Sequence, residues 1–138
     1  MKTLLLVVAA ALINEKGEIL LAQRPAGKRL AGKWEFPGGK VEADESPELA
    51  LARELHEELG ITVSPKDLEP FWFLSHDYSG EFDFHLLMPV YLCRAWQGAP
   101  KALEHAALAW VLPGDMQGWN MIEADAGLVQ RLQKNLRD

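Results

Sequence analysis

The chain has 138 residues, 49% of them hydrophobic, and a formal net charge of −6. This length suits a single domain over residues 1–138, and the apolar fraction is large enough to bury a core. The acidic balance argues against a partner such as DNA or RNA, because general nucleic-acid binders present a basic face to the phosphates. A small anionic ligand remains compatible with the charge, because a bound divalent cation inverts the local field.

The cysteine content also excludes some kinds of structure and site. The single cysteine, Cys93, excludes a disulfide within one chain and a zinc cluster built from cysteines. A reduced, cytoplasmic setting fits this count. Cys93 lies in an apolar run, so we interpret it as a small buried hydrophobe and not as a nucleophile. No apolar stretch reaches transmembrane length, so a membrane is not an expected partner.

The N-terminal run, MKTLLLVVAAALIN, allows two interpretations. One lysine followed by apolar residues and alanines resembles a secretory signal. A buried strand at 3–13 is favoured, because the run leads through a turn around Gly17 into a second apolar strand at 18–24. The two strands are expected to form a hairpin, and removal of the first would leave the second without its partner.

The rest of the chain predicts a mixed α/β pattern without regular βαβ alternation. A basic loop, RPAGKRLAGK, leads to a short extended piece, WEFP, and then to a Gly-Gly loop. A helix is expected over 47–59, with Ser46 as its N-cap, Pro47 in its first turn and Gly60 as its stop. Further strands are expected at 68–77, 83–93 and 106–111, with YSGEF as a turn, and a last helix at 124–136.

Three glutamates crowd one face of the expected helix. Glu54, Glu57 and Glu58 have the i, i+3, i+4 spacing of helical neighbours, whereas leucines at every fourth position form a separate apolar stripe. Like charges at this spacing cost roughly 0.2–0.5 kcal/mol per pair, and an ordinary solvated face would mix lysines among them. Hard cations bind carboxylate oxygens and bridge them to phosphates. The crowding therefore predicts a site for Mg²⁺, with Mn²⁺ as a substitute.

The spacing around these glutamates resembles a family motif. Residues 39–61 read GKVEADESPELALARELHEELGI. The glycine, the first box glutamate and the REL-x-EE-x-GI run match every specified position of the Nudix box. Four weaker features resemble the MutT branch of Nudix hydrolases: KWEFPGGK before the box, an arginine ending the preceding strand, a glutamate before a Trp-Val strand, and an Ala-Asp opening the last helix.

The resemblance implies a fold and an activity. The expected fold is α/β, an α/β/α sandwich around a mixed sheet. The expected enzyme uses Mg²⁺ to hydrolyse a (deoxy)nucleoside triphosphate to the monophosphate and pyrophosphate, by attack of water on a phosphorus, with the β-phosphorus as the expected target. Its substrates would include oxidised nucleotides such as 8-oxo-dGTP, which links it to nucleotide-pool sanitation and DNA repair. Two alternatives stay open: hydrolysis of another nucleoside diphosphate derivative, such as a nucleotide sugar or ADP-ribose, and a non-catalytic binding module.

The resemblance also implies metal ligands and catalytic groups. The expected metal ligands are the main-chain carbonyl of Gly38 and the carboxylates of Glu54, Glu57, Glu58 and Glu104. Glu104 is either a metal ligand, a general base or a plain surface acid. His105 is the alternative base, because imidazole titrates near neutrality. Whether the protein is a monomer or a homodimer stays open.

Other box residues are expected to shape the site. Arg53, counted among the catalytic residues, is expected to hold the geometry of the loop and helix through an ion pair with Glu45. Gly38 and Gly39 are expected to let the backbone approach a ligand. A plain turn is the simpler interpretation of the two glycines, and the helix dipole alone can explain an acid at Glu45.

Substrate contacts are assigned to Arg24, Phe36 and Asp125 besides the two glycines. Arg24 is expected to reach the nucleotide, while Lys28 and Arg29 are taken as solvated loop residues. Phe36 either lines the base pocket or packs in the core. Asp125 occupies a position where similar enzymes present an asparagine to the base. An ionised aspartate only accepts hydrogen bonds, so base preference stays open, and a helix cap is the alternative role.

Overall fold

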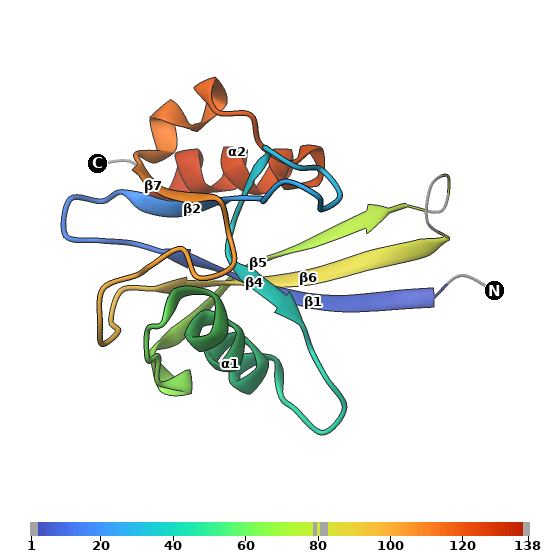
Figure 1. Ribbon diagram of the computed structural model, residues 1–138, viewed down its shortest axis with the longest axis horizontal. Coiled ribbons are helices and arrows are strands. Elements are labelled where there is room, and N and C mark those ends of the chain that lie inside the picture. The colour runs from blue at the N-terminus through green and yellow to red at the C-terminus, as the bar shows by residue number, and fades with distance from the viewer. Residues whose placement is uncertain (1–2, 79, 81–82, 137–138) are drawn as a thin grey trace.

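Two β-sheets form the frame of the protein. The computed structural model describes residues 3–78, 80 and 83–136 (Figure 1). A four-stranded sheet has the order β4-β1-β6-β5, and a three-stranded sheet has the order β3-β2-β7. Strand β1 runs parallel to β6, and the other neighbours are antiparallel. The strands are β1 (Thr3–Leu12), β2 (Ile19–Gln23), β3 (Trp34–Glu35), β4 (Gly38–Lys40), β5 (Leu68–Asp77), β6 (Phe84–Cys93) and β7 (Ala107–Val111).

Helices lie on both sides of the four-stranded sheet. Helix α1 (Pro47–Leu59) covers one face, and the three-stranded sheet with α2 (Ala126–Asn135) covers the other (Figure 1). Three short 3₁₀ turns were not expected from the sequence: η1 (Pro65–Asp67), η2 (Pro113–Gly118) and η3 (Glu123–Asp125). No helix in the described ranges is long and apolar enough to cross a membrane. This layered arrangement agrees with the expected sandwich.

Strand β1 explains the apolar N-terminal run. Its alternate residues face opposite cores: Ala9 and Ala11 point to the α2 side, and Val8, Ala10 and Leu12 to the α1 side. A strand buried on both faces reads as a continuous apolar run. The favoured interpretation of a strand is therefore confirmed for residues 3–12.

The expected hairpin between β1 and β2 was wrong. The two strands belong to different sheets, and an isolated bridge between Ile13 and Ile19 is the pairing that joins them. Strand β1 already has β4 on one edge and β6 on the other, so neither edge is left for β2. The chain therefore passes from one layer to the next at the turn around Gly17, which positions β2 and β3 over the first sheet.

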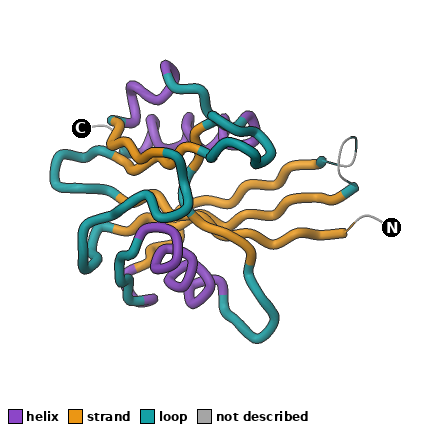
Figure 2. The backbone as a smooth tube through the Cα atoms, viewed as in Figure 1, coloured by secondary structure: helices purple, strands orange, loops and turns teal. Residues whose placement is uncertain are grey.

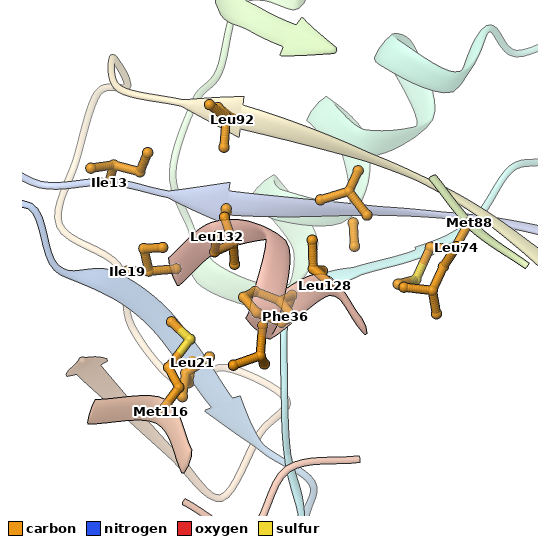
Figure 3. Close-up of a cluster of buried hydrophobic side chains, with 14 of the residues drawn as sticks. Ile13, Ile19, Leu21, Phe36, Leu74, Met88, Leu92, Met116, Leu128 and Leu132 are labelled. Carbon is orange, nitrogen blue, oxygen red and sulfur yellow. The ribbon is translucent and has the colours of Figure 1, made fainter. Parts of the chain in front are cut away.

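Each layer has its own apolar core. On the α2 side, Leu128 and Leu132 pack with Ile19, Leu21 and residues of β5 and β6 (Figure 3). On the α1 side, the predicted leucine stripe at positions 51, 55 and 59 is completely buried against β1. This burial places the neighbouring acidic side of α1 beside β4, where the Gly38 amide donates to Glu58.

Most boundaries agree with the sequence predictions. Helix α1 matches 47–59, the Ser46 hydroxyl accepts a hydrogen bond from the Leu49 amide at 3.2 Å, and Gly60 ends the helix at φ 73°. The expected Gly-Gly loop was wrong, because both glycines belong to β4. The expected YSGEF turn falls partly on residues 79, 81 and 82, outside the described ranges. Loops join these elements (Figure 2), and among them is the basic loop between β2 and β3.

Candidate active site

A cleft of about 720 Å³ opens beside β4 and the basic loop between β2 and β3. Most residues predicted from the sequence as site residues border it. They are Arg24, Phe36, Gly38, Gly39, Glu58, Glu104 and Asp125. Arg53, Glu54 and Glu57 do not line this cleft; they lie beside it on α1. Residues from the basic loop after β2, from β4 and α1, from the loop before β7 and from η3 before α2 thus meet at one place.

The three box glutamates differ in their surroundings. Glu58 is buried, with 7% of its surface exposed, and it accepts a hydrogen bond of 3.4 Å from the Gly38 amide. Glu54 is half-buried and Glu57 is exposed. One turn of helix therefore carries acids from the interior to the solvent along the same face.

Arg53 is the cation that organises this face. Its guanidinium donates to Glu45 through two nitrogens, at 2.7 and 2.9 Å, and one of them also donates to the Lys40 carbonyl at 3.1 Å. Its third nitrogen donates to Glu54 at 3.2 Å and to Glu57 at 3.3 Å. The expected Arg53–Glu45 ion pair is therefore present. It ties the loop that enters α1 to the glutamate face and, with a hydrogen bond from the Glu42 amide, lowers the pKa of Glu45 to about 2.

Two glycines allow β4 to lie close to its neighbours. A Cβ added at Gly38 would overlap the carbonyl oxygen of Val8 on β1, and one at Gly39 would overlap the carboxylate of Glu54. A larger residue at Gly38 would push β4 away from β1, and one at Gly39 would displace the Glu54 carboxylate. The glycines thus permit close packing of the backbone and bring the main chain of β4 to the acids, whereas the expected approach to a ligand stays a prediction.

Burial makes Glu58 an unusual acid. Desolvation, a hydrogen bond with Glu54 and the charge of Glu54 raise the pKa of Glu58 to about 9. Burial also raises the pKa of Glu54, against the opposing effect of Arg53. Two neighbouring carboxylates cannot both ionise cheaply at low dielectric, so the metal-free pair holds a proton at neutral pH. A divalent cation would replace that proton.

The donor set suits a hard divalent cation. Glu54, Glu58 and the backbone of Gly38 supply oxygen atoms, and Mg²⁺ prefers oxygen ligands. Within the described ranges, no three acidic, imidazole or thiol side chains already converge on one point, and Glu57 is turned toward Arg53. The fit therefore rests on the oxygen-donor chemistry of these ligands and on a shared proton that a cation can replace.

Asp125 is the other buried carboxyl of the cleft. It is 5% exposed and lines the cleft, and no hydrogen bond from the described residues contributes to its pKa. It precedes α2 but makes no capping hydrogen bond with its side chain, so the structure does not support the alternative of a helix cap. Desolvation, followed by the charge of Glu35, raises its pKa to about 7. An unpaired acid facing a cleft is suited to a polar ligand edge.

Glu35 was missed by sequence reasoning. Its carboxylate accepts hydrogen bonds from Arg24 at 3.2 and 3.3 Å, and its Oε2 lies 3.0 Å from the His105 Nε2. Its charge also contributes to the raised pKa values of Glu58 and Asp125. The only signal in the sequence was an acid between two aromatic residues in the WEFP segment. Its partners lie 11 and 70 positions away along the chain.

The remaining predicted residues take mixed positions. Phe36 is both buried in the α2-side core and a cleft residue, so both of its expected surroundings are present. Glu104 is exposed at the edge of the cleft. Lys28 and Arg29 are exposed, as expected for a solvated loop, but they also border the cleft. Tyr78 and Phe84, whose rings lie 5.1 Å apart, add an aromatic wall that the sequence analysis did not identify.

Comparisons with known proteins agree with this geometry. The NUDIX domain model matches residues 3–132. The CTP pyrophosphohydrolase of Escherichia coli is 42% identical over 130 residues, covering 89% of this chain and 87% of the relative. The 8-oxo-dGTP diphosphatase of Haemophilus influenzae is 39% identical over 132 residues, covering 95% and 93%. The crystal structure of the MutT NUDIX hydrolase from Burkholderia pseudomallei superposes with a TM-score of 0.81 at 31% identity, covering 95% and 99%.

These matches place the chain in a class of hydrolases that carry a glutamate-rich helix against a mixed sheet. The chain belongs to the Nudix family and has the Nudix fold. It is a Nudix pyrophosphohydrolase of the MutT type, as the box and the surrounding motifs predicted. These two relatives are named for different substrates, CTP and 8-oxo-dGTP, so they do not identify the nucleobase that this protein prefers.

Proposed function

We propose that the protein hydrolyses a (deoxy)nucleoside triphosphate to the monophosphate and pyrophosphate, with Mg²⁺, and that oxidised nucleotides such as 8-oxo-dGTP are among its substrates. The observation that carries this proposal is the meeting of two kinds of acid in one cleft. Glu58 belongs to the glutamate face of α1, whereas Asp125 is buried and unpaired. The first suits a cation and phosphates, and the second suits a nucleobase. A volume of about 720 Å³ is typical of a small-molecule site.

The glutamate face is proposed to hold the metal. Glu54, Glu57, Glu58, Glu104 and the Gly38 carbonyl would be its ligands. When bound, Mg²⁺ (or Mn²⁺) neutralises phosphate oxygens and lowers the charge that develops on the leaving group. Arg53 keeps Glu54 and Glu57 aligned, because one guanidinium contacts both carboxylates and Glu45.

The other chain residues have separate tasks in this proposal. Glu104, exposed at the cleft edge, accepts the proton of the attacking water. The basic groups of Arg24, Lys28 and Arg29 face the same cleft and favour an anionic substrate. Phe36 gives the cleft an apolar wall beside Asp125, which excludes water from the base.

Asp125 is proposed to select the base. In its neutral form the carboxyl donates one hydrogen bond and accepts another, and a pKa of about 7 keeps that form populated near neutral pH. An adjacent donor and acceptor are offered by N7–H and O6 of 8-oxoguanine, and also by the N4 amino group and N3 of cytosine. Cytidine triphosphate is therefore the second candidate substrate, favoured by the relative named CTP pyrophosphohydrolase.

A substrate panel tests the proposal. The purified protein with Mg²⁺ is given 8-oxo-dGTP, dGTP, dATP, CTP, dCTP, a nucleotide sugar and ADP-ribose, and the products are identified by chromatography and phosphorus NMR. We expect a nucleoside monophosphate and pyrophosphate, with the highest kcat/KM for 8-oxo-dGTP or a cytidine nucleotide. Release of orthophosphate, or a clear preference for ADP-ribose or the nucleotide sugar, would contradict it. Glu58→Gln serves as the control for contaminating phosphatases.

A further inference from the structure

The segment that carries Glu104 is anchored on both sides but not in its middle. Upstream, the Leu103 amide donates to the Glu58 carbonyl at 3.1 Å, and downstream the Ala106 amide donates to the Gln23 carbonyl at 2.9 Å. Between these anchors, neither Glu104 nor His105 makes a backbone hydrogen bond to any residue in the described ranges. The direction of the Glu104 side chain therefore depends on what holds its neighbour.

His105 is held by its side chain. The imidazole is 8% exposed, and its Nε2 lies 3.0 Å from Glu35 Oε2. A carboxylate only accepts hydrogen bonds, so Nε2 carries the proton and donates it to Glu35. The other ring nitrogen, Nδ1, is buried and has no partner within the described part of the chain. The hydrogen bond to Glu35 is thus the polar contact that holds this ring among the described residues.

Glu35 is itself firmly placed. It lies on β3 opposite Ala22 of the central strand β2, and β7 pairs with the other edge of β2. Arg24 donates to both oxygens of Glu35 and, through Nε, to the Arg29 carbonyl at 2.6 Å. The imidazole of His105 therefore binds the Glu35 carboxylate, which Arg24 already holds in place.

We propose that His105 is a positioning residue: its hydrogen bond to Glu35 holds the Glu104 segment against β3 and aims Glu104 into the cleft. This inference rests on the proposed function of Glu104. Both residues line the cleft, but the His105 side chain is 8% exposed whereas Glu104 is exposed, so fixing the buried ring restricts the orientation of the next side chain. Displacement of a reacting group by about 1 Å can cost about 100-fold in rate.

Four variants test the proposal: His105→Ala, His105→Gln, Glu104→Gln and the double variant Glu104→Gln/His105→Ala. His105→Ala is expected to lower kcat about 10- to 100-fold, the usual effect of losing a supporting hydrogen bond, with a much smaller change in KM. His105→Gln should recover most of the activity, because its amide Nε2 can donate to Glu35. In the Glu104→Gln background, removal of His105 should change kcat by no more than about twofold, because coupled residues are not additive.

A second measurement does not depend on turnover. Hydrogen exchange of the Ala106 amide, which donates to the Gln23 carbonyl, should be faster in His105→Ala than in the native protein and should return to the native rate in His105→Gln. His85→Ala is the matched control, because it removes a histidine hydrogen bond to Ser75 of 2.6 Å outside the cleft. It should change neither kcat nor this exchange.

The outcomes separate the two proposals. An equal loss from His105→Ala with and without Glu104, or unchanged exchange in the segment, would overturn the positioning role while leaving Glu104 in the mechanism. If Glu104→Gln keeps native turnover, the proposed function of Glu104 fails, and the positioning role fails with it.

Discussion

Glu58 on the glutamate face of α1 and Asp125 before α2 line the same cleft, yet the chain builds their surroundings in different ways. The glutamate face comes from one helix, and Arg53 and Glu45 hold it through contacts spanning eight positions. The pocket around Asp125 draws Glu35 from β3 and His105 from the loop before β7. The glutamate face is thus fixed by local spacing, whereas the surroundings of Asp125 and of Glu104 depend on how separate elements meet.

The largest expected effect is on the helix side. Glu57→Gln and Glu58→Gln should each lower kcat by several orders of magnitude, because each removes a proposed ligand charge. Circular dichroism should show an intact fold, since the leucine stripe is untouched. Glu48→Gln is the matched control on the same helix, where the carboxylate accepts from the Tyr91 hydroxyl at 2.9 Å away from the cleft. Near-native turnover of either variant at saturating Mg²⁺ would show that the metal site is elsewhere.

Glu104→Gln should produce a smaller but clear loss. Turnover should fall while nucleotide affinity stays close to native, because the residue is proposed to act on the water and not on the base. Steady-state kcat and KM, together with binding of the monophosphate product by calorimetry, measure the two effects separately. A raised KM with unchanged kcat would instead make Glu104 a substrate-binding residue.

Asp125→Asn probes the other region. It should change the ranking of substrates and not the rate of all of them equally, because an amide and a carboxyl offer different hydrogen bonds to a base edge, worth about 10- to 100-fold in kcat/KM. In the native protein, the ratio of kcat/KM values for two bases should change as the pH rises through about 7, where Asp125 ionises. In the variant this ratio should not depend on pH. An unchanged ranking in Asp125→Asn and Asp125→Ala would remove Asp125 from base recognition.

The pH dependence of thermal stability tests the metal site at Glu58. The pKa of Glu58 is raised from 4.5 in the unfolded chain to about 9 in the folded, metal-free protein. Its contribution to stability is therefore full below about 4.5 and is lost as the pH rises through about 9. Mg²⁺ competes with that proton, so Mg²⁺ should raise the melting temperature more at pH 8.5 than at pH 6. Glu58→Gln should remove this difference, and an equal shift at both pH values in the native protein would contradict the assignment.

The smallest expected effect concerns the start of α1. Ser46→Ala removes the N-cap hydrogen bond to Leu49 and should lower the free energy of unfolding by about 1 kcal/mol. Urea denaturation measures it. Ser64→Ala is the control, because Ser64 also precedes a helical turn but makes no capping hydrogen bond. Base ranking should be unaffected by both, whereas a changed ranking would mean that α1 also positions the base.

The features that could be predicted from the sequence are those built from local contacts, and the features that could not are those built from separate elements. Helix α1, its cap and its acidic and apolar faces could be predicted because their contacts are short-range. Glu104 and Asp125 were identified only through the resemblance to MutT. Glu35 was missed because its contacts are with Arg24 and His105, and the pairing of β3 and β7 with β2 is what brings these residues together. The expected hairpin failed for the same reason, since the edges of β1 are occupied by β4 and β6, distant in the sequence.

Strand β1 has a further consequence for how the protein is made. Its parallel partner β6 begins at Phe84, which pairs with Thr3, so the first strand waits for roughly eighty residues of synthesis before its neighbour exists. Contacts of such long range close slowly, because the intervening chain loses entropy when its ends meet. Until then a strand made almost entirely of apolar residues is exposed. We therefore expect the emerging chain to be most prone to aggregation at β1 before β6 is made, although the folded protein buries the second half of that strand on both faces.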